Sequence, residues 1–132
     1  MNNSKNYWKN KKIIKINSCA NASLFRFLSN MNFDYKSKNV LEIGFGNGSD
    51  LLEFKKRGSL VYGIDINKFA VNQLKKKHNS LILQKLDCTS TDNFFKNIKF
   101  DLIYHRDLIY YLSDVEIKNL QKNICDNLKK KG

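Results

Sequence analysis

Val40-Leu41-Glu42-Ile43-Gly44-Phe45-Gly46-Asn47-Gly48 is an apolar run, interrupted by one acid, that leads into three glycines at alternate positions. Residues of about 48–57 follow with apolar side chains at helical spacing, and Gly58 ends that pattern. A short buried strand that feeds a glycine turn and then a helix is typical of parallel α/β sheets, which hold a nucleotide at the helix N-terminus. Glycine suits such a turn because it tolerates positive φ and leaves the backbone open to a ligand.

The rest of the chain alternates strands and helices around this stretch. Apolar runs predict further strands, and apolar spacing of three and four predicts further helices. The predicted strands are 60–66, 81–86 and 100–104, and the predicted helices are 20–31, one after a cap at Asn67, and one after Ser113. Four strands that alternate with helices predict an α/β fold with a Rossmann-like open parallel sheet and helices on both faces.

The last predicted helix has clear signals at both ends. Ser113 and Glu116 form a capping box, and basic residues followed by Gly132 are typical of a helix C-terminus. Its expected buried stripe is Val115, Ile117, Leu120, Ile124 and Leu128.

Two acids stand at positions that suggest binding. Glu42 lies in an otherwise apolar strand, where an unpaired charge is costly, so we expect it to have a function. Asp65 ends the second strand about 20 residues after the glycine turn, where a carboxylate can accept both ribose hydroxyls of a nucleoside. Read alone, Asp65 is equally consistent with a surface acid at the end of a strand.

The glycine spacing distinguishes two kinds of nucleotide site. A dinucleotide fingerprint, G-x-G-x-x-G, would place its third glycine at Ser49. Gly44, Gly46 and Gly48, with Glu42 two residues before them, instead resemble motif I of the class I S-adenosylmethionine-dependent methyltransferases. This makes a nicotinamide-dependent oxidoreductase the weaker hypothesis.

The resemblance implies a cofactor, S-adenosyl-L-methionine, and a set of residues around it. Glu42 would hold the methionine end, Asp65 the ribose, and Asp87 the adenine amino group, with the Cys88 backbone along the ring. Asp87 is also consistent with a helix cap. The cofactor-binding residues predicted in this way are Glu42, Gly44, Phe45, Gly46, Gly48, Asp65, Ile66, Asp87, Cys88 and Tyr104.

Residues 100–113 resemble the motif IV region of the same family, although Tyr110 and Tyr111 occupy the places of its paired histidines. Histidine base catalysis at those two positions is therefore not expected. His105 and Arg106 remain the catalytic candidates, with a purely structural histidine as the alternative. The chain contains no proline, so the proline motifs of DNA amino-methyltransferases and cytosine C5 enzymes are missing, and these substrate classes are disfavoured.

The resemblance also predicts the organisation of the chain. Residues 1–37 would be an N-terminal arm and a lid helix, and residues 38–132 the cofactor-binding domain. The family's strand order would give 3-2-1-4 here, with the sheet truncated before its last three strands. We expect either a further C-terminal segment or a partner to complete the sheet.

Composition narrows the class of partner. The net charge is +12 and the pI about 9.7, but the lysines are scattered, so a nucleic-acid partner is possible and not favoured. The three cysteines form no C-x-x-C pair, so no metal site is predicted. The sequence shows no signal peptide and no membrane span, and we expect a cytoplasmic protein.

These observations lead to one preferred function and one alternative of a different class. The preferred hypothesis is methyl transfer from S-adenosylmethionine to an unknown acceptor, with a small molecule or a sugar or lipid intermediate favoured. The alternative is a non-catalytic nucleoside-binding fragment or module that needs a partner.

Overall fold

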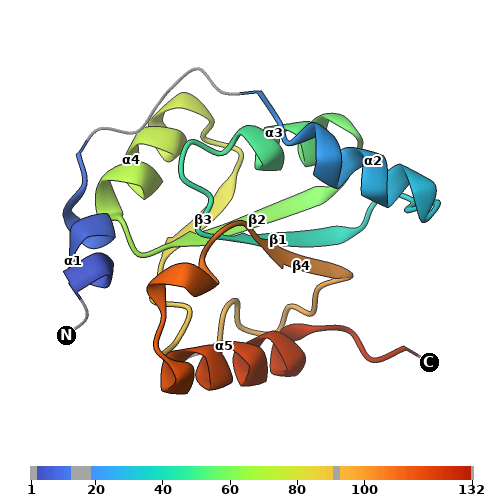
Figure 1. Cartoon of the computed structure of the whole chain (residues 1–132). Helices are drawn as coiled ribbons and strands as arrows, with labels where there is room; N and C mark the ends of the chain where they lie inside the picture. The colour runs from blue at the N-terminus through green and yellow to red at the C-terminus, as the bar shows by residue number, and fades with distance from the viewer. Residues whose placement is uncertain (1–2, 13–18, 91–92, 132) are drawn as a thin grey trace.

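A computed structural model describes residues 3–12, 19–90 and 93–131 of the 132-residue chain, and its centre is a four-stranded parallel sheet (Figure 1). The strand order is β3-β2-β1-β4, which confirms the predicted order and fold class. The strands are β1 (Asn39–Ile43), β2 (Leu60–Asp65), β3 (Ile82–Lys85) and β4 (Leu102–His105). The helices are α1 (Asn3–Asn10), α2 (Ala22–Asn30), α3 (Ser49–Lys56), α4 (Lys68–Lys77), the 3₁₀ turn η1 (Ile109–Tyr111) and α5 (Asp114–Asn127).

Helices cover both faces of the sheet. α2, α3 and α4 lie on one face, and α5 lies across the other (Figure 1). Because side chains alternate along a strand, β1 divides its own between the two cores. Val40 packs towards α3, whereas Leu41 and Ile43 pack towards α5. The sheet is therefore buried on both sides, as expected for parallel strands.

The strand register aligns the carboxyl ends of the strands. Glu42 of β1 stands opposite Gly63 of β2 and Tyr104 of β4. Asp65, at the end of β2, pairs with Lys85 of β3. The polar residues predicted to bind a ligand consequently emerge along one edge of the sheet, where open α/β sheets bind their ligands.

Local signals at the helix starts agree with the sequence. The Asn67 side chain accepts the N–H of Ala70 at the start of α4, and Asn21 caps α2 in the same way. Ser113 and Glu116 form the predicted capping box of α5. These caps fix where the helices begin.

The predicted ends and faces of two helices need correction. Val115 was expected in the buried stripe of α5 but is 68% exposed, because it lies in the first turn on the solvent side. Leu128 was placed within the helix, yet α5 ends at Asn127 and Leu128 is extended. The helix predicted at 20–31 is α2, which spans Ala22–Asn30. Its Phe25 and Leu28 are buried, whereas Phe27 faces solvent.

The segment after α5 returns to the sheet. Leu128 forms a parallel bridge with Phe100, and the Lys129 N–H donates to the Phe100 carbonyl at 2.9 Å. Residues 129–131 are therefore not the last helical turn that the basic run suggested. Their backbone lies instead beside the entry to β4.

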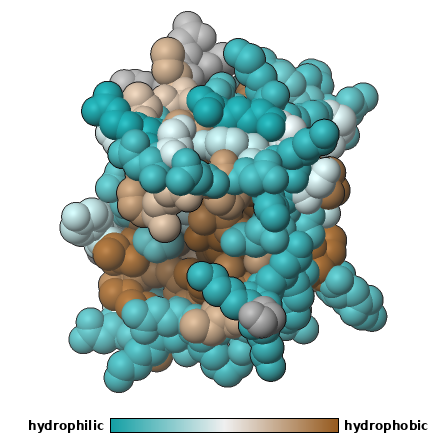
Figure 2. Space-filling model, turned by 90° about the vertical axis from the view of Figure 1, so that its right-hand side faces the viewer, coloured by the Kyte–Doolittle hydropathy of each residue, from teal (hydrophilic) through white to brown (hydrophobic). Residues whose placement is uncertain are grey.

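β4 is the outer strand on its side of the described sheet. All four of its residues are half-buried, whereas Val40, Leu41 and Ile43 of β1 are buried. Apolar side chains gather at mid-height on the C-terminal side of the molecule, between hydrophilic zones above and below (Figure 2). Within the described residues, β4 pairs with β1 alone, so its other edge has no neighbouring strand.

Candidate active site

A cavity of about 600 Å³ lies at the carboxyl ends of the strands. Its volume falls within the range of about 300–1,000 Å³ usual for small-molecule sites. Residues from the strand ends, the glycine turn, α1 and η1 line it: Lys5, Trp8, Lys11, Glu42, Ile43, Gly44, Phe45, Gly46, Asn47, Ile64, Asp65, Ile66, Asn67, Ala70, Leu86, Asp87, Cys88, Arg106, Asp107, Leu108, Tyr111 and Leu112. The cavity therefore has an apolar body with acids on its strand side and cations around them.

The glycine turn forms one wall. Gly44, Gly46 and Gly48 have φ values of 72°, 55° and 78°, so the turn uses the conformational freedom of glycine at all three positions. No atom lies within 4 Å of where a Cβ of Gly46 would stand, so this side of the backbone is open. The main chain is consequently accessible to a ligand, as the sequence predicted.

Asp65 is fixed against this turn. Its Oδ2 accepts the Gly46 N–H at 3.1 Å, and its Oδ1 accepts the Asn67 N–H at 2.8 Å. Burial raises the pKa of Asp65, while these backbone N–H groups act in the opposite direction. The carboxylate thus ties the end of β2 to the glycine turn and still lines the cavity.

Glu42 is a buried acid without a complete set of partners. It is 5% exposed, and its Oε2 accepts no hydrogen bond from the residues that the structure describes. Burial and the nearby charge of Asp50 raise the pKa of Glu42 well above its usual value, against the opposing influence of Tyr104 and Arg106. Because an unsatisfied buried polar atom is costly, its retention beside the cavity points to a ligand.

Tyr104 and Asp50 complete a polar cluster behind Glu42. Asp50, at the start of α3, accepts the Asn21 N–H at 2.7 Å. The Tyr104 hydroxyl is buried and has no hydrogen-bond partner among the described residues, and burial together with the charges of Glu42 and Asp50 raises its pKa. Tyr104 does not line the cavity, so the structure places this predicted cofactor residue one layer behind it.

Asp87 follows β3 and is held by neighbours on two sides. Its Oδ1 accepts the backbone N–H and the hydroxyl of Thr89, at 3.0 and 2.8 Å. Its Oδ2 lies 2.7 Å from the Nζ of Lys5. Partial burial opposes ionisation, yet Lys5 and Thr89 hold the pKa of Asp87 below its usual value. Asp87 therefore caps the turn after β3 and also presents a charged carboxylate to the cavity.

Cys88 is buried in the same wall, and burial raises the pKa of its thiol to about 12. The side chain is thus a neutral apolar surface. This suits the predicted role, in which only its backbone borders a ring.

The two catalytic candidates, His105 and Arg106, differ in their position relative to the cavity. Arg106 lines the cavity, whereas His105 does not. The Nδ1 of His105 is buried and meets no partner in the described part of the chain, and burial lowers the pKa of the imidazole, which favours its neutral form. Direct action of His105 on a ligand in this cavity is therefore not supported by its placement.

The structure brings together most of the predicted binding residues. Gly48 and Tyr104 are the two cofactor candidates that do not line the cavity. Gly48 instead permits close packing, because its Cβ would lie 2.4 Å from Leu74. No residue of α2 lines the cavity, so the helix that covers it among the described residues is α1 rather than the expected lid at 20–31.

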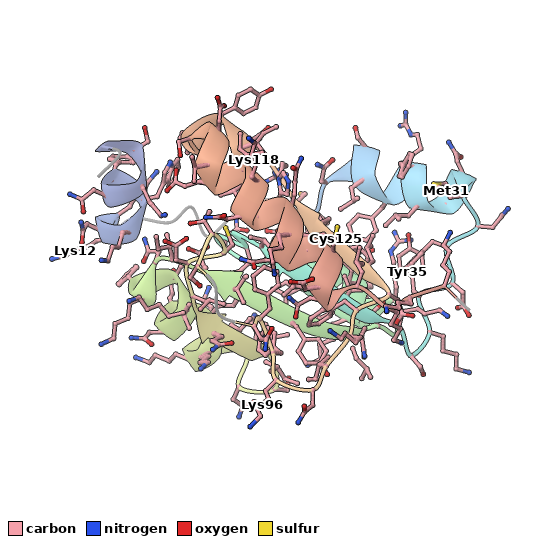
Figure 3. The ribbon with its side chains drawn as sticks, turned by 90° about the horizontal axis from the view of Figure 1, so that it is seen from below. Lys12, Met31, Tyr35, Lys96, Lys118 and Cys125 are labelled. Atoms are coloured by element: carbon pink, nitrogen blue, oxygen red, sulfur yellow. The ribbon has the colours of Figure 1, made fainter. Side chains whose placement is uncertain are left out.

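The predicted site residues include none from α1 or η1. Lys5, Trp8 and Lys11 line the cavity from the N-terminal segment, and Tyr111 lines it from η1. The signal for this was a tryptophan within a basic arm, which suits either a cover or a packing contact. Figure 3 shows α1 beside the N-terminal part of α5, to which the ion pair between Lys5 and Glu116 joins it. The N-terminal segment therefore reaches the cavity from the α5 side.

A family model described as a methyltransferase domain matches residues 40–132. The chain belongs to this family. The matched region begins with β1 and includes all four strands, the glycine turn and α5. The class I methyltransferase resemblance drawn from the motifs is thereby confirmed.

Curated relatives are phosphoethanolamine N-methyltransferases. The enzyme of Plasmodium falciparum is 36% identical over 98 residues, which cover 71% of this chain and 35% of that protein. Phosphoethanolamine N-methyltransferase 1 of Zea mays is 30% identical over 101 residues, which cover 74% of this chain and 20% of that protein. The chain therefore spans about a fifth to a third of the length of these relatives.

Solved structures share the fold at low sequence identity. Magnesium protoporphyrin IX methyltransferase from Synechocystis PCC 6803, with bound S-adenosylmethionine, superposes with a TM-score of 0.65 at 18% identity, covering 80% of this chain and 51% of that one. Phosphoethanolamine N-methyltransferase 1 of Haemonchus contortus, in complex with phosphoethanolamine and S-adenosylhomocysteine, gives a TM-score of 0.68 at 20% identity, covering 84% and 24%. Both likenesses support the Rossmann-like architecture.

The described residues lack two further features. No described helix is both long and apolar enough to cross a bilayer. Within residues 3–12, 19–90 and 93–131, no three acids, histidines or cysteines gather as a metal site would require.

Proposed function

We propose that the cavity binds S-adenosylmethionine and that this domain transfers the cofactor's methyl group to a small-molecule acceptor. The observation that carries the proposal is the unsatisfied, buried Oε2 of Glu42 beside the open glycine turn. A buried carboxylate oxygen suits a cationic donor such as an amino-acid ammonium group. The relatives crystallised with S-adenosylmethionine or S-adenosylhomocysteine give independent support.

The remaining residues fit the other parts of such a cofactor. Asp65 would accept from the ribose, and Asp87 with the Cys88 backbone would border the adenine. When bound, the cofactor supplies a methyl group already activated by its sulfonium. The chain's own residues then act mainly by holding two reactants in place, an effect worth up to about 7–11 kcal/mol.

For the acceptor, we propose a small anionic amine of the phosphoethanolamine type. Lys11 and Arg106 line the cavity and offer cationic donors for a phosphate. The curated relatives from maize and Plasmodium are named for this substrate. In this proposal Arg106 binds the acceptor, and His105 stays a structural residue.

Calorimetric titration with S-adenosylhomocysteine tests the cofactor site. We expect binding by the parent protein and at least a tenfold weaker affinity in Asp65→Ala, because a carboxylate that accepts charge-assisted hydrogen bonds contributes about 1.5–3 kcal/mol. Asp126→Asn is the matched control, since Asp126 is an exposed acid of α5, far along the chain from the cavity residues. Equal affinities for Asp65→Ala and the parent would remove Asp65 from the site.

The same titration with NADH tests the oxidoreductase hypothesis, for which we expect no binding. Incubation with labelled S-adenosylmethionine and phosphoethanolamine separates an enzyme from a binding module. Cofactor binding without any methyl transfer would favour the non-catalytic alternative.

A further inference from the structure

Lys5 of α1 makes an unusually complete set of contacts for a lysine at a protein surface. Its Nζ lies 2.7 Å from Oδ2 of Asp87 and 2.7 Å from Oε1 of Glu116, and donates to the hydroxyl of Thr89 at 3.0 Å. These partners belong to the end of β3, the turn after it and the first turn of α5. The side chain is only 18% exposed. An ammonium group has three donors, and all three are used here.

The other contacts of α1 also fall on cavity residues. The Asn67 side chain donates to the carbonyls of Trp8 and Lys11, at 2.9 and 2.6 Å. The rings of Trp8 and Tyr111 meet edge to face at 5.4 Å, and the Lys11 ammonium lies 4.6 Å from the Trp8 ring centre. The α1 segment is thus joined to β3, α4, η1 and α5 around one cavity.

We propose that Lys5 is a positioning residue, whose ammonium group latches α1 across the cavity and so retains the bound cofactor. This rests on the proposed function for the identity of the ligand. Each acid contacts Lys5 through only one of its carboxylate oxygens. The other oxygen keeps its local hydrogen bond: Asp87 Oδ1 accepts from Thr89, and Glu116 Oε2 accepts from Ser113. Lys5 therefore joins the two walls without disturbing the turn or the α5 cap.

Polar contacts decide the position of α1 because little else holds it. The helix has eight residues, and isolated helices of that length are unstable in water. None of its described side chains belongs to either apolar core. Loss of one well-placed charge contact can consequently open α1 while the sheet and both cores stay folded.

Trp8 provides a direct probe of this opening, since it is the only tryptophan of the chain. The test compares Lys5→Met, which keeps a long apolar stem without charge, with Lys5→Arg, which keeps the charge. Lys9→Met is the matched control, because Lys9 is exposed on the same helix. Circular dichroism melting confirms that each variant remains folded.

Two readouts are measured on all four proteins. Without ligand, acrylamide quenching of Trp8 should become at least twofold stronger in Lys5→Met and stay unchanged in the arginine and Lys9→Met variants. With ligand, the dissociation rate of S-adenosylhomocysteine should rise at least fivefold in Lys5→Met, with rescue by Lys5→Arg.

Distinct outcomes overturn the latch and the cofactor assignment. Unchanged quenching in Lys5→Met would overturn the latch, and so would stronger quenching with an unchanged or slower dissociation rate. If the parent protein binds no S-adenosylhomocysteine, the proposed function fails, and the latch stands or falls on Trp8 quenching alone.

Discussion

Glu42 is a buried acid whose place in the central strand β1 is costly to the folded domain. An acid between Leu41 and Ile43 would be costly in a buried strand, and the structure shows it 5% exposed with an unsatisfied Oε2. Burial raises the pKa of this carboxyl, which means that the folded state disfavours the ionised carboxylate. We therefore expect Glu42 to lower the stability of the ligand-free domain at neutral pH.

Glu42→Gln should stabilise the ligand-free domain at pH 7–8 by about 1–3 kcal/mol, the usual cost of an unsatisfied buried polar group. A carboxyl whose pKa is raised on folding adds stability below its unfolded pKa, and this contribution is lost as pH rises through the folded pKa. The gain from glutamine should therefore shrink towards zero near pH 4. Urea unfolding from pH 4 to pH 8 measures this, and a variant less stable than the parent at pH 8 would contradict it.

For other predicted site residues, the sequence does not show whether the side chain lines the cavity, because this depends on the direction in which it points near the end of a strand. Tyr104 and His105 are neighbours in β4, and both were predicted site residues. Tyr104 packs with the core under α3, and neither residue lines the cavity. The next residue, Arg106, does line it. The motif thus placed its candidates within two residues of a cavity-lining residue, but it could not show which of these side chains faces the cavity.

At the scale of elements, the unit of β1, the glycine turn and α3 is the best-predicted part of the molecule. Its glycines all adopt the positive φ that the turn requires. Gly48 has a further role that no spacing rule reveals, since its missing Cβ makes room for Leu74 of α4. The contact lies between segments 26 residues apart, so only the folded structure shows it.

Gly48→Ala should destabilise the domain by about 2–5 kcal/mol. Strain at a φ of 78° accounts for about 1–2 kcal/mol, and overpacking against buried Leu74 adds about 1–3 kcal/mol. Gly58→Ala is the matched control, because its φ is 100° but the nearest atom to its Cβ, the Lys36 Cα, lies at 3.7 Å. Urea midpoints should fall clearly further for Gly48→Ala, and equal losses in the two variants would refute the packing argument.

Elements with few apolar side chains were the hardest to predict. The N-terminal segment reads as a polar arm, but residues Asn3–Asn10 form α1. Its stabilising contacts come from Asp87, Glu116 and Asn67, which lie more than 50 residues away. Periodicity cannot report such contacts. The position of the N-terminal segment, and with it two of the three cations that line the cavity, therefore had to come from the structure.

At the scale of the whole molecule, unbalanced charge is the dominant electrostatic feature. Lysine and arginine number 24 against 12 acids, which gives the net charge of +12. Within the described residues, ion pairs engage the cations Lys5, Arg57, Lys122 and Lys129. A domain of this length has a radius of gyration of about 14 Å, so at low ionic strength most of its cations repel one another.

Added salt should therefore stabilise the domain. The Debye length is about 30 Å at 10 mM and about 8 Å at 150 mM, so repulsion acts across the whole molecule only at the lower concentration. We expect the melting temperature to rise by about 3–5 °C between 10 and 150 mM NaCl, which corresponds to roughly 1 kcal/mol. Lys96→Gln is an informative variant, since Lys96 is exposed in a loop at the periphery (Figure 3). It should melt above the parent at 10 mM and level with it at 150 mM, whereas a melting temperature that falls with salt would mean that the ion pairs outweigh the repulsion.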